Sequence, residues 1–504
     1  MGDWRDLDRD QLEKHLDHEC KKRGLTRRDL MKGGAGMAAA LGLGWLAAAC
    51  GGSDEEAAAP PSGGEPAPPP SGEPAAPPSE EAPKFTGTLR VTGLGVDLID
   101  PIKTAGEKAL GFKLAFDVTD SVTMVQKAIT QPGSFDVFSG YTYQYNQAFQ
   151  SGNFHNEEIA KITNWGQMSP LINKGKVDTA STTCTYGDGD APFRSLYIDP
   201  DKTGNWNASS ETPSELTDLL VSWVDEETGQ TVGDEPLYTI GPPNNFNMDS
   251  MGYNGDVIQK EPGDVDWPEL FNATYQGRVA LLNDPGIGLQ DAGNAAKASG
   301  MMTFGSLGNM TKEEIDGIVQ ILLDLKAKNH FRAFWTTFDE SVNLMASNEV
   351  VIESMWSPAV ALLVAQGLNV RYAAPPSGFR GWCSTMSISK EAEADPSLLQ
   401  ACYDYINWWH SGEPGAIMMR QGYYNAVQET SRQFVEPEEY AFWIDGEAAA
   451  KDLPGITGQV GDIKKGQIRD GGSFTDRACF YSSWNSYFEE NEYQIQRWNE
   501  FLSA

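Results

Sequence analysis

A proline-rich tract divides this chain into a part that can fold and a part that cannot. Residues 53–84 contain ten of the 29 prolines, interspersed with Ala, Ser, Gly and Glu. This composition supplies too few apolar side chains for a core and favours extended polyproline conformations. At roughly 3 Å per residue, the tract reaches at most on the order of 100 Å. We therefore interpret residues 50–84 as a tether, which leaves the chain from Phe85 onward to form the folded body.

The segment before the tether has the pattern of an export signal, and we expect residues 1–49 to be removed. Arg27 and Arg28 precede a stretch rich in Gly, Ala and Leu that is too short and too weakly apolar for a permanent span. The arginine pair resembles a twin-arginine signal, which implies export of an already folded protein. Cys50 and the alanines before it resemble a lipobox, although the usual leucine falls one place early, at Leu46. The alternative is an ordinary signal peptide with an incidental cysteine.

Acylation of Cys50 would give the chain a lipid anchor and no membrane span of its own. The expected location is then the periplasm or the outer face of a bacterial membrane. In such an oxidising compartment one or two disulfides could form, but the sequence leaves the pairing of four cysteines open. These are Cys184, Cys383, Cys402 and Cys479.

Charge and composition exclude several classes of protein. The chain carries 38 Lys and Arg against 71 Asp and Glu, and its net charge of -33 repels the phosphates of nucleic acids. Its 40% apolar residues are enough for a large core. Six cysteines, none in a C-x-x-C pair, and five histidines offer little for a structural metal site. We therefore expect no nucleic-acid partner, no metal and no cofactor.

Short apolar runs alternate with helical patterns throughout the body. The best strand candidates are residues 89–92, 135–138, 279–282, 350–352 and 370–372. Helices are expected after Thr311, which starts a capping box, and after Asp395, which precedes a proline. The alternation is typical of α/β folds in which helices cover both faces of a parallel sheet. Because roughly 420 residues exceed the size of one ordinary domain, we expect two lobes.

Aromatic residues lie beside carboxylates at several points of a sequence without the usual enzyme signatures. No nucleophile elbow, phosphate loop, H-E-x-x-H or dinucleotide fingerprint occurs. Trp335 precedes Asp339 and Glu340, and Trp356 and Trp382 follow. Aromatic faces and carboxylates both attract positive charge in a partly dry cleft, which favours an alkylammonium ligand. The alternative for each residue is interior packing for the tryptophan and solvation for the acid.

Four segments, taken in order, resemble a known family. They are residues 135–141, 251–256, 275–284 and 349–356. In order and spacing they resemble the periplasmic solute-binding proteins of ABC importers, and among these the spermidine/putrescine-binding branch. The resemblance covers about residues 86–504 and implies a type II fold, in which two α/β lobes joined by crossing hinge strands trap a ligand. Lobe 1 is expected to comprise residues 85–238 and 384–428, and lobe 2 residues 239–383 and 429–504.

The resemblance also implies ligand contacts. Ser139 and Tyr141 match the contact segment of the first lobe, Trp382 matches a tryptophan that stacks on the ligand, and Tyr423 matches a cleft tyrosine. With the aromatic and acidic candidates above, these complete the expected ligand-binding set. The set is Ser139, Tyr141, Asp284, Trp335, Asp339, Glu340, Trp356, Trp382, Ser384 and Tyr423.

The chain departs from the polyamine binders at three places. Ser384 stands where they have an acid, Leu94 where they have a tryptophan, and Asp284 alone represents an acidic pair. A doubly charged polyamine needs a carboxylate near each end, which Asp339 and Glu340 would have to supply. The segment from about residue 176 to 235 looks inserted relative to the family.

The implied function is that of a substrate-binding lipoprotein without catalytic activity. It would deliver a small organic cation, with a polyamine as the leading candidate, to an ABC permease in the inner membrane. Tyr423 and Tyr424 leave a ferric-ion binder of the same fold as one alternative. An exported hydrolase that uses Asp339 and Glu340 is a second, and an acidic envelope protein without a small ligand is a third.

Overall fold

The computed structural model describes residues 84–173, 185–188, 196–199, 221, 223, 233–486 and 488–504. The expected signal, Cys50 with its expected acylation, and the tether up to residue 83 lie outside these residues, as does most of the segment 176–235. In the described part of the chain, no helix has both the length and the apolar character needed to cross a bilayer.

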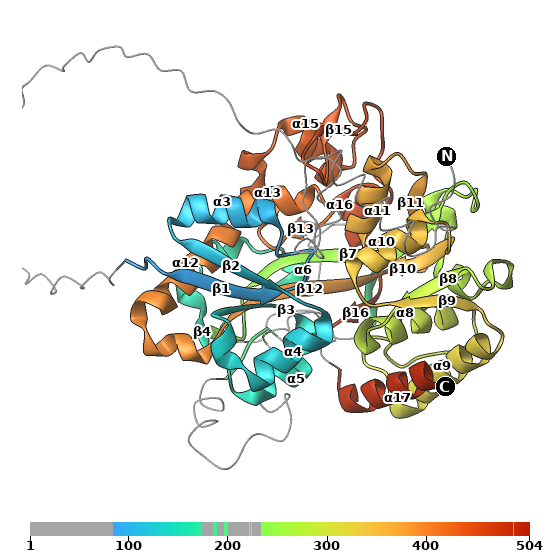
Figure 1. The fold of residues 1–504 in the computed structure, drawn as a ribbon, viewed down its shortest axis with the longest axis horizontal. Helices are drawn as coiled ribbons and strands as arrows, with labels where there is room; N and C mark the ends of the chain where they lie inside the picture. Colours follow the sequence, from blue (N-terminus) through green and yellow to red (C-terminus); the bar gives the residue numbers. More distant parts are fainter. Residues whose placement is uncertain are drawn as a thin grey trace, which may run out of the picture. The chain divides into compact units, whose positions relative to one another are not determined.

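Two long strands, β7 (Pro243–Asn254) and β12 (Phe379–Ile388), run through the centre of a mixed 12-stranded sheet (Figure 1). The strand order along the sheet is β2-β1-β3-β12-β7-β10-β8-β9. Strand β7 pairs with β12 as far as Asp249 and with β10 from Ser250 onward. All of β12, and all of β7 except its last residue, is buried, as expected for strands that run between two packed lobes.

Lobe 1 is built on the parallel strands β1 (Thr88–Gly93), β2 (Lys113–Val118) and β3 (Val137–Tyr141). Helices α3 (Asp100–Leu110) and α12 (Pro396–His410) cover one face, and α4 (Ser121–Thr130) and α5 (Tyr145–Ala148) cover the other (Figure 1). The helix predicted after Asp395 is confirmed, because the Asp395 carboxylate accepts hydrogen bonds from the first backbone amides of α12. The strand predicted at residues 135–138 begins two residues later.

Lobe 2 contains the parallel strands β8 (Val279–Leu282), β9 (Phe331–Trp335) and β10 (Ile352–Met355), with β11 (Val370–Tyr372) antiparallel to β7. Helices α8 (Pro285–Ala298), α9 (Lys312–Ala327) and α17 (Asn491–Ser503) lie on one side, and α10 (Phe338–Ala346) and α11 (Ser357–Ala365) on the other (Figure 1). The predicted capping box forms: Thr311 and Glu314 each bond the other's backbone amide.

The remaining elements extend both lobes. The C-terminal part contributes α13 (Glu413–Met419), β13 (Tyr424–Asn425), α14 (Gln428–Ser431), α15 (Pro437–Tyr440), β14 (Leu453–Pro454), β15 (Val460–Ile463), α16 (Phe474–Ala478) and β16 (Phe480–Asn485). Strand β16 pairs in parallel with β12 and with β5 (Thr185–Asp188), while β4 (Glu157–Glu158) pairs with β6 (Tyr238–Thr239) and α6 spans Pro170–Asn173. Cys479 forms a disulfide, whereas Cys383 and Cys402 are free and buried.

The predicted two-lobed α/β architecture with crossing strands is confirmed. The largest apolar cluster lies mainly in lobe 1 and extends onto the crossing strands, two others lie in lobe 2, and a fourth lies around Trp443 and Leu453. The sheet is mixed: β7 is antiparallel to β10 and β12, and β12 is antiparallel to β3 but parallel to β16. This mixed pairing lets each crossing strand belong to the sheet while the chain passes from one lobe to the other.

Candidate functional site

A nearly filled cavity lies where the two lobes meet the crossing strands. Its free volume is about 20 Å³, which is close to the room that one water molecule needs. Its lining comes from lobe 1, from β7 and β12, and from lobe 2. The lining residues are Leu94, Tyr141, Tyr143, Asp249, Ile287, Trp356, Arg380, Trp382 and Tyr423.

Trp382 is the centre of an aromatic triad in this cavity. Its ring centroid lies 5.2 Å from that of Tyr141 and 5.0 Å from that of Tyr423. Each ring comes from a different element, β12, β3 and the turn before β13, so the fold brings together residues far apart in sequence. Tilted and edge-to-face rings in this distance range leave electron-rich faces that can attract a cation.

A buried carboxylate stands behind each of three aromatic side chains of the cavity. Trp382 Nε1 donates to Asp249 Oδ2 at 2.6 Å, and the Tyr141 hydroxyl donates to Asp97 Oδ2 at 2.7 Å. The Tyr143 hydroxyl donates to Asp284 Oδ2 at 3.0 Å. These bonds fix the orientations of the rings, and the three carboxylates place negative charge around the cavity.

The guanidinium of Arg380 balances part of this negative charge. Arg380 Nε donates to Asp291 Oδ1 at 2.7 Å, and its Nη2 lies 3.8 Å from Asp249 Oδ2. Arg380 and Asp291 are both almost wholly buried, so they form an ion pair inside the protein. If all four acids are ionised, Asp97, Asp249, Asp284 and Asp291 outnumber the single arginine, and the site as a whole is negative.

Burial makes these acids harder to ionise. It raises the pKa of Asp249 to about 6, against the opposing influence of Arg380 and of the hydrogen bonds from Trp382 and Tyr372. Burial likewise raises the pKa of Asp97 to about 6, although hydrogen bonds from Tyr141 and Asn245 lower it. Both carboxylates are therefore mostly ionised at neutral pH and titrate between neutral and mildly acidic pH.

Seven of the ten predicted site residues lie in or next to this cavity. Tyr141, Trp356, Trp382 and Tyr423 line it. Asp284 caps α8 and contacts the lining residue Tyr143. Ser384, opposite Tyr141 on adjacent strands, donates to the backbone carbonyl of Asn245. Ser139 is buried on β3, two residues before Tyr141, and its hydroxyl has no hydrogen-bond partner among the described residues.

Of the other three predicted site residues, Trp335 lies one layer behind the cavity: it is buried in lobe 2, and its ring packs edge-on against the lining residue Trp356, with the centroids 5.1 Å apart. Asp339 and Glu340 are exposed in the first turn of α10, and Glu340 caps that helix by accepting from the amides of Thr336 and Thr337. This pair does not supply the cavity with the second carboxylate that a polyamine needs, nor does it form a hydrolytic site there.

The structure does not bring the two tyrosines of the ferric-ion alternative to one point. Tyr423 lines the cavity, whereas the Tyr424 ring packs against Phe246 and Phe474. Within the part of the chain that the structure describes, no group of three or more His, Cys, Asp and Glu side chains is arranged to hold a metal ion.

Sequence reasoning missed Asp97, Asp249, Arg380 and Asp291. A signal for Asp249 was present: Asn245, Asn247 and Asp249 alternate with apolar residues along β7, so one face of a fully buried strand is polar. Polar side chains that recur at every second position of a buried strand need hydrogen-bond partners, and in this protein the partners include Asp97 and Trp382. Nothing local marks Arg380, because its partners lie 89 and 131 residues away.

The geometry can be compared with known proteins. The family profile of the bacterial extracellular solute-binding proteins matches residues 101–450. No curated protein matches the chain in sequence. A Listeria monocytogenes protein described as a spermidine/putrescine ABC transporter is 16% identical, with a TM-score of 0.50 over 82% of this chain and 98% of its own. This likeness supports the fold alone.

Two further solved structures are similar at a lower level. The spermidine/putrescine ABC transporter substrate-binding protein of Streptococcus pneumoniae is 13% identical, with a TM-score of 0.48 over 83% of this chain and 98% of its own. The PBP AgtB from A. tumefaciens R10, solved with agropinic acid, is 12% identical, with a TM-score of 0.47 over 83% of this chain and 100% of its own.

The Arg380 ion pair generates a stability prediction. Asp291→Ala leaves the buried guanidinium with only the more distant Asp249, so we expect it to lower the free energy of unfolding by about 3–5 kcal/mol. The double variant Arg380→Met/Asp291→Leu removes both charges and should recover most of this loss. Urea unfolding followed by circular dichroism measures both. Exposed Asp339→Asn is the control, expected within about 0.5 kcal/mol of the parent. A loss below about 1 kcal/mol for Asp291→Ala would contradict the account.

Proposed function

The chain belongs to the family of bacterial extracellular solute-binding proteins, and we propose that it captures a small organic cation, a polyamine above all, for an ABC permease. The observation that carries the proposal is the aromatic triad of Tyr141, Trp382 and Tyr423, with buried carboxylates bonded to two of its rings. An ammonium group between such rings gains both the ring quadrupole and the ionic attraction.

Charge complementarity supports a cationic ligand. Arg380 is bonded to Asp291 and also lies 3.8 Å from Asp249, whereas Asp97 and Asp284 have hydrogen-bond donors but no close positive charge among the described residues. A ligand with one or two ammonium groups would compensate this charge. An anionic ligand would add to it, and only Arg380 would favour its binding.

Hydrogen-bond acceptors next to the triad support the same class of ligand. The Asn245 amide donates to Asp97 and the Asn247 amide donates to Asp249, while the Oδ1 atom of each asparagine is buried without a hydrogen-bond partner in the described part of the chain. Buried acceptors without donors are costly. An ammonium group carries three N–H donors and no acceptor, so it fits a site with spare acceptors.

Ligand entry requires the lobes to separate, because the cavity is almost filled. We assign the hinge to the points where β7 changes partner, between Asp249 and Ser250, and where β12 passes between the lobes. The proposed lobes are residues 85–238 with 384–428, and 239–383 with 429–504. Binding would then follow the open-to-closed movement of a hinged clamp. Two similar solved proteins are named for spermidine and putrescine, in keeping with this class of ligand.

Export and membrane attachment complete the proposal. The twin-arginine pattern, Cys50 and the proline-rich tract would place the folded clamp on a tether outside the cytoplasm, close to a permease. The extracellular character of the family supports export.

Amine binding is tested by thermal shift and calorimetry with putrescine, spermidine, amino acids, sugars and ferric citrate. We expect the amines to raise the melting temperature, by linkage of binding to folding. Trp382→Phe and Asp249→Asn should each weaken putrescine binding about tenfold or more, because they remove the Nε1–carboxylate bond or the charge. Asp339→Asn is the matched acidic control and should bind normally. A screen in which no amine shifts the melting temperature would refute the cation proposal.

The raised pKa of Asp249 gives the binding a pH dependence. Because this pKa is about 6, the affinity for putrescine should fall as the pH drops through 6, when the carboxylate takes up a proton. Ligand-free stability should change in the opposite direction: the folded state holds the proton more tightly, so this contribution to stability grows from pH 7 to pH 4. Calorimetry and urea unfolding across this range measure the two trends. Asp249→Asn should reduce both slopes but leave a remainder from Asp97, whose pKa is also about 6. Unchanged slopes in this variant would show that Asp249 does not contribute.

Acylation of Cys50 is tested by extraction from membranes. We expect the native protein to require detergent and the Cys50→Ala form to appear in the soluble fraction, because one residue carries the lipid. Cys402→Ala, which alters a buried free cysteine of the body, is the control and should remain with the membrane. Equal solubility of the native and Cys50→Ala forms would exclude the lipoprotein assignment.

A further inference from the structure

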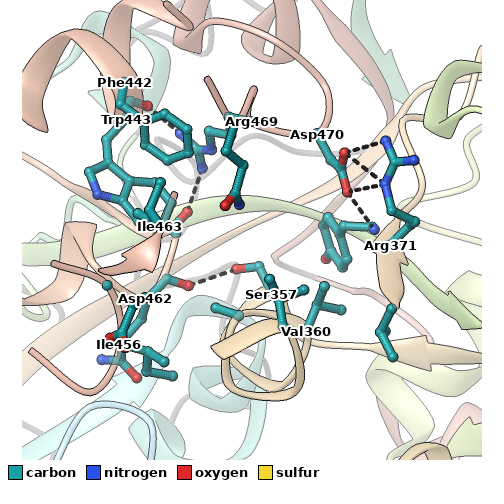
Figure 2. A pocket seen from close by; sticks show the side chains of 18 of the residues that line it. Ser357, Val360, Arg371, Phe442, Trp443, Ile456, Asp462, Ile463, Arg469 and Asp470 are labelled. Carbon is teal, nitrogen blue, oxygen red and sulfur yellow. Dashed lines mark hydrogen bonds and ion pairs between the residues drawn. The ribbon is translucent and has the colours of Figure 1, made fainter. Parts of the chain in front are cut away.

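A second cavity, much larger than the first and called the side cavity below, lies between α11 and the C-terminal segment from Phe442 to Arg477. It has a volume of about 470 Å³ and is lined by α11 and β11, by residues 420–422, and by side chains between Phe442 and Arg477. This volume is in the range of sites for small organic ligands. Figure 2 shows Phe442, Trp443 and Ile463 on one side of this side cavity and Arg371 with Asp470 on the other.

Four arginines line this side cavity in a protein that is strongly acidic overall. Two have carboxylate partners: Arg371 Nη2 donates to Asp470 Oδ1 at 2.8 Å, and Arg420 Nε donates to Glu439 Oε1 at 2.6 Å. The two acids that line the side cavity are also engaged, Asp470 with Arg371 and Asp462 with the amide of Thr457 at 3.0 Å.

Arg469 is buried without an anionic partner among the described residues. Its guanidinium donates to the carbonyls of Trp443 and Gly422 and lies over the rings of Tyr424 and Trp443, at 4.8 and 5.2 Å from their centroids. Its side chain is mostly withdrawn from water, and this burial lowers the pKa of Arg469 to about 10, with a further lowering from the neighbouring Arg477 charge. Two of its five N–H donors are used, so others remain for a ligand.

Arg477 repeats this arrangement. It is 2% exposed and donates to the carbonyls of Asp470 at 3.1 Å and Met248 at 2.8 Å. Among the residues that the structure describes, its buried Nε has no hydrogen-bond partner and its guanidinium no carboxylate partner. Its guanidinium lies 4.7 Å from the ring centroid of Phe379. Two adjacent buried cations without a carboxylate are costly, since a buried charge is normally paired. A bound anion would supply the missing partner.

The apolar walls of the side cavity indicate that the ligand has an apolar part besides its anionic group. Val360 and Val364 of α11 face Ile456, Ile463 and other apolar side chains of the C-terminal segment. A bare inorganic anion would leave this apolar surface uncovered, whereas a carboxylate with a hydrocarbon body would cover it and gain its burial. We propose that the side cavity binds a small organic carboxylate, whose anionic group contacts Arg469 and Arg477 and whose apolar body lies against α11.

This site is distinct from the aromatic cavity and opposite to it in charge. The two are linked through the chain, because Gln421 and Gly422 line one and Tyr423 lines the other. The side cavity also touches both lobes, through Gly422 on one side and α11 on the other. The proposal does not rest on the cation assignment, so either can fail while the other stands.

The proposal is tested with pairs of acids and their uncharged amides: benzoate and benzamide, hexanoate and hexanamide. At constant ionic strength and pH 7.5, we expect the carboxylates to raise the melting temperature and the amides to leave it unchanged. Arg469→Gln should weaken benzoate binding about tenfold or more in calorimetry, and Arg469→Lys should retain part of the affinity.

A second variant covers the case in which Arg469→Gln does not fold. Ala361→Phe fills the side cavity from α11 without removing a charge, and should abolish benzoate binding. Gln366→Phe, which places the same aromatic side chain at the exposed C-cap of α11, is its control and should bind benzoate normally. Equal shifts by acid and amide, no shift by either acid, or full benzoate affinity in folded Ala361→Phe would overturn the proposal.

Discussion

Arg380 and Asp249 face each other on the two antiparallel strands that pass between the lobes, and this buried pair of opposite charges organises the centre of the protein. The strand register makes them direct partners, and it pairs Trp382 with Asn247 two positions further along the same two strands. Arg380 is also bound to Asp291 of α8, so one side chain connects both crossing strands to a lobe 2 helix. Because a buried charge requires its partners, these elements must keep their relative positions.

From this centre the charges separate into two environments. Acids gather on the aromatic side, where Asp249 and Asp97 orient Trp382 and Tyr141 through their hydrogen bonds. Arginines gather on the other side, around the larger side cavity. Tyr372 joins the two, since its hydroxyl donates to Asp249 Oδ1 at 3.2 Å while its residue lines the side cavity. One chain can thus present a negative and a positive pocket close to the same pair of strands.

The sequence predicted the features that depend on neighbouring residues better than those that depend on residues far apart in the chain. Local signals were reliable: Thr311 and Asp395 cap the helices that their patterns predicted, and the run at residues 279–282 is a strand. The family resemblance located the cleft aromatics, including Trp382 and Tyr423. Asp339 and Glu340 were assigned to the binding site because they follow a tryptophan closely in the sequence. In the structure they lie in the first turn of α10, where Glu340 caps the helix. Arg380 and the side cavity depend on contacts between distant segments, which no local pattern encodes.

The central claim is that the space between Trp382 and Tyr423 accommodates an organic cation when the lobes open and close around it. A crystal structure of the protein grown with saturating putrescine tests this most directly. The account predicts the diamine among the rings of Tyr141, Trp382 and Tyr423, with one ammonium nitrogen within hydrogen-bond distance of Asp249 and the cavity enlarged to hold it. A structure with this cavity still closed and the diamine absent from it would contradict the account.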